Sequence, residues 1–213
     1  MALARTRVHE QRGQRDRGAG GHQIDETDVK ALLLSGTLVW ALSSTPASAG
    51  DADCIWEHLP LNARRSTFAA YERGGADALG EVRIDDSAVL ASYRACTRRA
   101  SATPAAAIGP ALVGAALEHA AMRHLNLVDG IDPMRLERAW RGLAPAERQS
   151  LRAAYLAPDA EIPAAAFAAI DKAVELAGYR PAPVAHVVGD ARYRHLADFF
   201  EGRAQKEAYQ LRF

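Results

Sequence analysis

Histidines are the residues of this chain with the most versatile chemistry, because imidazole both binds transition metals and transfers protons near neutral pH. Downstream of residue 50 they occur at His58, His119, His124, His186 and His195. His119 and His124 are five residues apart, about 140° around a helix, so they do not form the i, i+4 ligand pair of a metal-binding helix. HExxH and Glu-x-x-His motifs are also absent. We therefore assign no catalytic, cofactor-binding or metal-binding residue, and retain His124 and His195 as candidates for a site between two helices.

Arg148 is the third candidate, and it lies in a segment rich in charge. Residues 135–152 carry Arg135, Glu137, Arg138, Arg141, Glu147, Arg148 and Arg152. Spacings of three and four residues between opposite charges are typical of a solvated helix face. The alternative interpretation is a patch that binds an anion or a protein partner. For nucleophilic or phosphate chemistry, the sequence has neither a G-x-S-x-G motif nor a glycine-rich loop after a strand.

The two cysteines, Cys54 and Cys96, favour a structural cross-link over reactive chemistry. Two cysteines without a third in an exported domain predict one disulfide. On the chain-entropy model, a closed loop of about 43 residues is worth roughly 3–4 kcal/mol. Two buried free thiols are the alternative. CxxC, CxxCH and cysteine-rich zinc motifs are absent, and we expect no cofactor.

A secretory signal is the clearest targeting feature of the sequence. Lys30 precedes the uncharged, mostly apolar run Ala31–Leu42, and small residues follow at Ala47-Ser48-Ala49. This order predicts a signal peptide at residues 29–49 that is cleaved between Ala49 and Gly50. The run of about 12 residues is shorter than the roughly 20 that a spanning helix needs. We expect a periplasmic or secreted protein with no stable membrane span after cleavage.

Residues 1–28 do not fit an ordinary signal peptide, because they are polar and too long for its N-terminal part. They contain five Arg and five acidic residues with almost no apolar periodicity, a composition typical of disorder. One hypothesis is a disordered N-terminal extension. The other is a misassigned start, with translation beginning at Val29 read as Met. N-terminal sequencing of the unprocessed protein distinguishes the two.

The remaining 164 residues are enough for one domain with a substantial core. The chain has 26 Lys and Arg and 26 Asp and Glu residues, of which six and five precede residue 50, leaving 20 and 21. A net charge near −1 provides no electrostatic footprint for nucleic acid or for an anionic membrane. We expect residues 50–213 to form a single helical domain that does not bind nucleic acid.

Local signals predict that this domain is an all-α bundle of about six or seven helices with one disulfide. Ala, Leu, Arg and Glu dominate and favour helices, and no alternating pattern indicates a strand. Asp132-Pro133 and Pro145 predict helix starts, and Asp85 or Asp86 can cap another helix. The segment 104–125 is apolar nearly all round, so we expect it to be the central buried helix.

One part of the domain matches another at an offset of 84 residues. The shared pattern, W-x2-L-x4-R-x-S-x2-AAY, begins at Trp56 and again at Trp140, with seven identities in 16 positions. A duplication relating residues 54–130 to 138–213 would explain the match and would give two pseudo-repeated halves. Chance similarity of amphipathic helices is the alternative.

These observations favour a non-enzymatic protein that binds an unknown protein or small molecule outside the cytoplasm. The missing catalytic motifs and the repeated pattern are the basis for this hypothesis. The alternatives are an enzyme with a dispersed site that uses His124, His195 or Arg148, and a metal or cofactor carrier that uses the histidines. Convergence of His124, His195 and a carboxylate in the fold would favour the alternatives. A closed apolar bundle with every histidine at the surface would favour the first hypothesis.

Overall fold

The computed structural model describes residues 51–96, 105–156, 163–180 and 189–210. Within these ranges the chain forms eight α-helices and one 3-10 helix, and no strand. The predicted all-α fold is confirmed, with one helix more than the upper expectation. None of the described helices has the length and apolar character needed to cross a membrane. The predicted extension (1–28), signal peptide (29–49) and cleavage site (Ala49–Gly50) lie outside the described residues.

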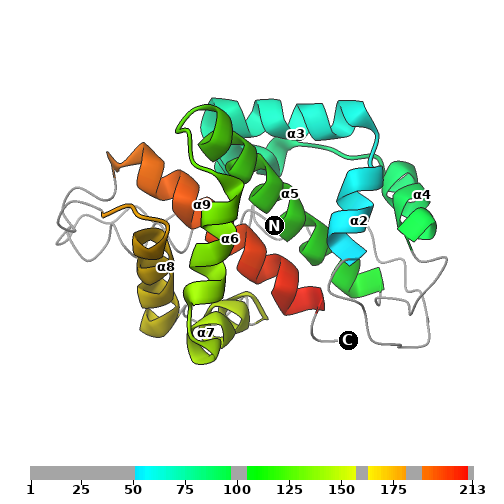
Figure 1. The fold of residues 1–213 in the computed structure, drawn as a ribbon. Coiled ribbons are helices and arrows are strands. Elements are labelled where there is room, and N and C mark those ends of the chain that lie inside the picture. Colours follow the sequence, from blue (N-terminus) through cyan, green and yellow to red (C-terminus); the bar gives the residue numbers. More distant parts are fainter. Residues whose placement is uncertain (1–50, 97–104, 157–162, 181–188, 211–213) are drawn as a thin grey trace, which may run out of the picture.

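Two long helices, α5 (Ala105–Leu127) and α9 (Ala191–Gln210), cross at the centre and make the most extensive interhelical contact (Figure 1). Gly114 and Gly202 lie at the crossing. A Cβ atom on Gly202 would lie 2.6 Å from the backbone nitrogen of Glu118, and one on Gly114 would lie 2.8 Å from the carbonyl oxygen of Gly202. Only glycine therefore allows the two backbones to approach this closely.

The other helices pack in two groups around this crossing (Figure 1). The group beside α5 consists of α2 (Asp51–His58), α3 (Leu61–Gly74), the 3-10 helix η2 (Asp77–Glu81) and α4 (Asp86–Cys96). The group beside α9 consists of α6 (Pro133–Gly142), α7 (Pro145–Leu156) and α8 (Ala164–Leu176). Residues that are distant in the sequence therefore meet where α5 and α9 cross.

Local capping signals set several of the helix boundaries. The Asp132 carboxylate accepts a hydrogen bond from the backbone nitrogen of Met134 at 2.9 Å, and Pro133 is the first residue of α6. This arrangement satisfies one of the unpaired N–H groups at the helix start. α7 begins at Pro145 and α4 at Asp86, as the sequence predicts.

The predicted disulfide joins α2 to α4, with the Cα atoms of Cys54 and Cys96 5.9 Å apart. Below it, α2 packs on α5 through a small apolar cluster. Its buried members are Ala52, Ile55, Trp56, Leu59, Ala111, Leu112, Ala115 and Ala116. The larger apolar cluster lies among α3, α5, α6, α7, α8 and α9, so the disulfide is at one end of the molecule.

The residues that match at an offset of 84 occupy corresponding places in two pairs of helices. Trp56 lies in α2, and Leu59 lies in the connection from α2 to α3. Trp140 lies in α6, and Leu143 lies in the connection from α6 to α7. All four side chains are buried. They therefore belong to the core, and the duplication stays a prediction.

Candidate histidine site

The crossing of α5 and α9 brings together the two histidines that the sequence marks as candidates. His124 lies in the last turn of α5, and His195 lies near the start of α9. Their ring centroids are 4.0 Å apart, with 40° between the ring planes. Tyr71 of α3 is edge-on to His124, with 5.9 Å between centroids. Three helices from separate parts of the sequence thus meet at one point.

Hydrogen bonds around Tyr71 determine which nitrogen of His195 carries the proton. The Tyr71 hydroxyl donates to Oδ2 of the buried Asp198 at 2.7 Å, and its oxygen is 2.8 Å from Nδ1 of His195. A hydroxyl has one proton, which is already given to Asp198, so Nδ1 of His195 must be the donor in the second bond. The lone pair of a neutral His195 is then on Nε2.

Two polar atoms lack hydrogen bonds here, one in His124 and one in Asp129, whose charge acts on the pKa of His195. Nδ1 of His124 and Oδ2 of Asp129 are both buried, and neither has a hydrogen bond within the described part of the chain. Leaving a buried polar group unsatisfied costs about 1–3 kcal/mol. Such groups in a native fold require an explanation, and one explanation is a ligand. We call Tyr71, His124, Asp129, His195 and Asp198 the histidine site.

The electrostatics of the histidine site keep His195 uncharged. Burial lowers the pKa of His195 below its ordinary value of 6.5, and the adjacent His124 lowers it further. Asp198 and Asp129 act in the opposite direction without reversing the shift, and Arg194 adds to the lowering. His195 is therefore a neutral imidazole at neutral pH.

Arg148, the third candidate from the sequence, has a different environment. One nitrogen of its guanidinium donates to the carbonyl oxygens of Leu143 at 2.6 Å, Arg141 at 3.2 Å and Trp140 at 3.4 Å. These carbonyls are at the C-terminal end of α6, where they have no partner within the helix. Arg148 therefore caps α6.

A second polar cluster, which the sequence did not reveal, lies further along the same two helices. Lys206 of α9 is 3% exposed, and its Nζ is 2.6 Å from Oε2 of Glu118 and 2.8 Å from each carboxylate oxygen of Asp53. Nε2 of His119 is 3.2 Å from Oδ1 of Asp53. Burial alone would raise the pKa of Asp53, but the bonds from His119 and Lys206 together lower it from 3.8 to about 2.

Arg203 extends this cluster towards α6 and α7. Its guanidinium pairs with Glu118 at 3.3 Å and also with Glu137. Glu207 accepts hydrogen bonds from Nε1 of Trp140 at 2.9 Å and from Arg152 at 3.1 Å. We call the ion-paired carboxylates and cations the buried charge network, in which Glu118 and Lys206 are buried and the others half-buried: Asp53, Glu118, Glu137, Arg152, Arg203, Lys206 and Glu207. Oε2 of Glu118 and Nε of Arg203 make no regular hydrogen bond, but each lies in an ion pair, at 2.6 Å and 3.3 Å, so every charge of the network faces an opposite charge.

Glu118 provides the signal by which the sequence could have revealed the network. It lies in a segment that is otherwise apolar on almost every face. A carboxylate on a buried helix must be paired with a cation, because its desolvation is otherwise too costly. One such cation is Lys206 of α9, which lies 88 residues further along the chain. The sequence does not identify that partner.

No protein-family model matches the chain, and no curated protein or solved structure shows significant similarity to it.

Proposed function

We propose that this protein is an exported binding protein whose ligand is a divalent transition-metal ion, held between His124 and His195. The observation that carries the proposal is that the ring centroids of His124 and His195 are 4.0 Å apart and that Nδ1 of His124 is buried without a hydrogen bond. The sequence favours a binding protein and leaves a metal carrier that uses the histidines as an alternative. The proposal combines these two hypotheses. Export rests on the signal pattern at residues 29–49 and agrees with the disulfide.

The chemistry of the unused atoms favours a cation as the ligand. Nε2 of His195 offers a lone pair, and Nδ1 of His124 is a buried nitrogen without a hydrogen bond. Neutral imidazole suits zinc, copper, iron and nickel, and a carboxylate oxygen is compatible with the same ions. An anionic ligand would need protonated histidines, which the lowered pKa of His195 opposes.

Outer contacts of His195 resemble those that support metal ligands in general. A metal-binding histidine usually donates its other ring N–H to a fixed acceptor, which orients the ring. Here that acceptor is the Tyr71 hydroxyl, which is itself fixed by the buried Asp198. The ring orientation and the tautomer are therefore set before a ligand arrives.

The test is zinc or cobalt binding by the purified full chain after dialysis against a chelator. We expect one ion per chain by calorimetry and, for cobalt, visible absorption typical of nitrogen ligands. His124→Gln and His195→Gln should each weaken binding at least about tenfold, whereas His119→Gln, which contacts Asp53 outside the histidine site, should leave it unchanged. Retained affinity in both site variants, or no binding by the wild type, would reject the proposal.

Export has its own test, which is independent of metal binding. N-terminal sequencing of the protein recovered from the envelope fraction or the medium should give Gly50 as the first residue. An intact N-terminus on a protein found only in the cytosol would reject export but not metal binding.

A further inference from the structure

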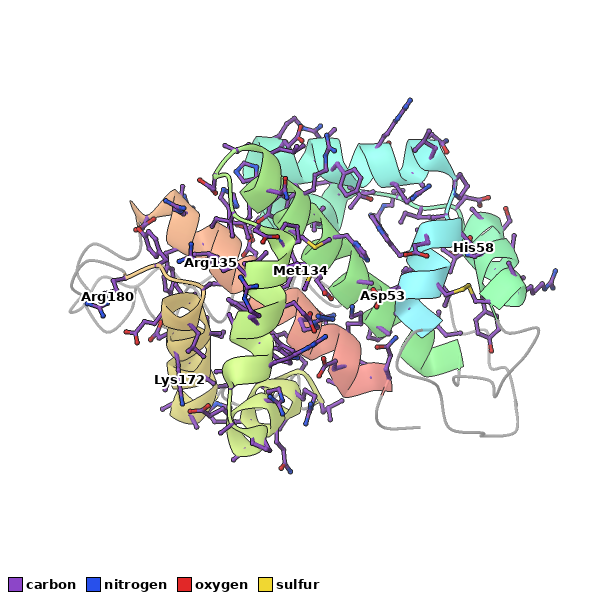
Figure 2. The ribbon with its side chains drawn as sticks, viewed as in Figure 1. Asp53, His58, Met134, Arg135, Lys172 and Arg180 are labelled. Carbon is purple, nitrogen blue, oxygen red and sulfur yellow. A yellow bond between two sulfur atoms is a disulfide. The ribbon has the colours of Figure 1, made fainter. Side chains whose placement is uncertain are left out.

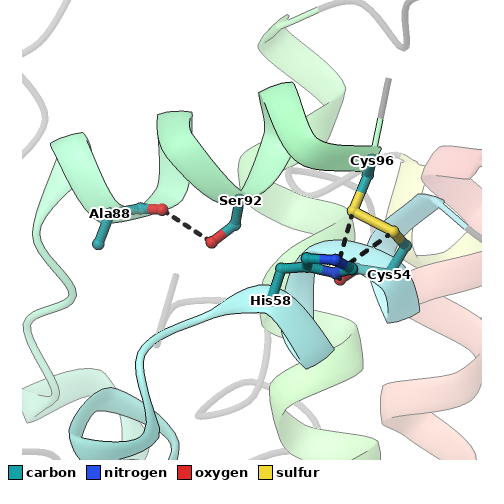
Figure 3. The surroundings of a disulfide bond; sticks show 5 residues. All are labelled: Cys54, His58, Ala88, Ser92 and Cys96. Carbon is teal, nitrogen blue, oxygen red and sulfur yellow. Dashed lines mark hydrogen bonds between the residues drawn. A yellow bond between two sulfur atoms is a disulfide. The ribbon is translucent and has the colours of Figure 1, made fainter. Parts of the chain in front are cut away.

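The disulfide has a histidine beside both of its sulfur atoms. Nδ1 of His58 is 3.6 Å from Sγ of Cys54 and 3.7 Å from Sγ of Cys96 (Figure 3). Among the described residues, these three form the one cluster of three potential metal-ligating side chains with all ligand atoms within 4.8 Å of one another. His58 is exposed, and the cysteines are only half-buried. Figure 2 shows His58 and the disulfide at the α2–α4 end of the molecule. An external thiol therefore has access to the bond.

The hydrogen bonding of His58 points an N–H group towards the sulfurs. Its Nδ1 is 2.9 Å from the carbonyl oxygen of Cys54, one helical turn earlier. A carbonyl only accepts hydrogen bonds, so Nδ1 carries a proton. That proton lies between the carbonyl and the two sulfurs, where it can stabilise a thiolate or be transferred to it.

The two sulfurs are not equivalent as leaving groups. Cys96 lies in the C-terminal half of α4 as described, Asp86–Cys96, towards the carbonyl end of the helix, which disfavours a negative charge. Cys54 lies in the N-terminal half of α2 and on the same helix as His58. A negative charge that develops on Cys54 is therefore better stabilised, and a better-stabilised thiolate leaves faster in exchange.

We propose that Cys54–Cys96 is a redox-active disulfide that exchanges with an external protein dithiol, with His58 as the proton donor to the leaving sulfur. One thiolate of the dithiol attacks Sγ of Cys96, an S–S bond forms to it, and the Cys54–Cys96 bond breaks. The electron pair of the broken bond goes to Cys54, which takes the Nδ1 proton of His58, while Nε2 of His58 takes up the proton released by the attacking thiol, so that the imidazole ends neutral. The second thiol of the dithiol then attacks the mixed disulfide. Cys96 leaves as a thiol, and the dithiol ends as its own disulfide, oxidised by two electrons.

This inference goes beyond the proposed metal binding, because it concerns another cluster at the opposite end of α5. It also differs from the purely structural cross-link that the sequence favours.

The experiment measures the rate at which dithiothreitol reduces the folded full chain, by trapping free thiols with a maleimide. His58→Ala should slow reduction roughly tenfold or more, because it removes the proton donor. The matched control is reduction in concentrated guanidinium chloride, where wild type and variant should react equally fast. His119→Ala, on α5, should react like the wild type under native conditions.

Two results would overturn the proposal. One is an equal rate for wild type and His58→Ala in the folded state. The other is a wild-type rate no faster than global unfolding, measured by circular dichroism under the same conditions, because the bond would then react only in the unfolded chain. Both results leave the zinc titration of the histidine site unaffected, so the two proposals can fail separately.

Discussion

The buried charge network and the histidine site both collect polar side chains at the contact of α5 with α9, but they differ in how completely these are paired. In the network, Lys206 pairs with Glu118 and Asp53, and Arg203 bridges Glu118 to Glu137. In the histidine site, a nitrogen of His124 and an oxygen of Asp129 are buried without partners. The first arrangement is balanced by its own charges, whereas the second would be completed by the ion that we propose.

This difference separates two uses of buried polarity. A complete set of ion pairs makes the packing of two helices specific, since any other register would leave charges unpaired. Buried polar atoms without partners lower the free energy of unfolding, and an ion that binds them in the folded state raises it again. The network should therefore control stability, and the histidine site should control binding.

The largest expected effect is at the centre of the network. Lys206→Met leaves Asp53 without its lysine and leaves Glu118, which is 7% exposed, with Arg203 as its one remaining cation among the described residues. Loss of one partner of a buried ion pair should lower the free energy of unfolding by about 3–5 kcal/mol in urea denaturation. Lys172→Met is the control, because Lys172 pairs with Glu147 but is 47% exposed, and it should cost less than about 1 kcal/mol. Equal losses in the two variants would contradict the assignment.

The next largest effect is at the helix crossing on which both regions depend. Gly202→Ala should cost about 1–3 kcal/mol, because its Cβ meets backbone atoms of α5 that cannot move separately. Zinc affinity should fall as well, since the two histidines are on the displaced helices. Gly109→Ala is the control: nothing lies within 4 Å of its Cβ, and it should stabilise α5 by up to about 1 kcal/mol. A neutral Gly202→Ala variant would show that the helices tolerate a wider spacing.

A smaller effect on stability separates structure from binding. Tyr71→Phe removes the hydroxyl between Asp198 and His195, so we expect a loss of about 1 kcal/mol and a roughly tenfold to hundredfold loss of zinc affinity. Tyr209→Phe is the control, because its hydroxyl donates to the carbonyl oxygen of Tyr155 at 3.0 Å, away from the histidines. It should lose similar stability and keep full zinc affinity. The same zinc affinity in both variants would remove Tyr71 from the site.

The smallest expected effect is a pH dependence that belongs to the histidine site. The pKa of His195 in the folded chain is below its ordinary 6.5. As the pH falls, His195 is therefore protonated in the unfolded chain before it is protonated in the folded chain. The stability due to a neutral His195 is complete above 6.5 and decreases as the pH falls from 6.5 through the folded pKa. His195→Gln should flatten the unfolding curve in this window. An unchanged slope would show that another group titrates there.

Much of the fold follows from local sequence, because its determinants are close together along the chain. Asp132-Pro133 caps and starts α6, Pro145 starts α7, and Asp86 starts α4. The Cys54–Cys96 pairing also follows, since two cysteines allow only one intramolecular bond. Each of these predictions needs only a few neighbouring residues or a count.

The candidate site was predicted only in part, because it depends on tertiary geometry. His124 and His195 are 71 residues apart, and they meet only because Gly114 and Gly202 let α5 and α9 cross closely. No local pattern in the sequence marks Gly114 as the point of close approach. The contact of the Tyr71 hydroxyl with His195 could not be inferred without the crossing.

The disulfide closes residues 54–96 into a covalent ring, with its two cysteines 42 positions apart. All of α3 lies within that ring, including Tyr71, which holds His195 in place. A protease that cuts the ring once leaves both fragments attached, and they separate only after reduction. If the disulfide exchanges as proposed, oxidising conditions keep the segment with Tyr71 inside a closed covalent loop. Reducing conditions open that loop at Cys54–Cys96. Chain connectivity then links the redox-active end of the molecule to the histidine site.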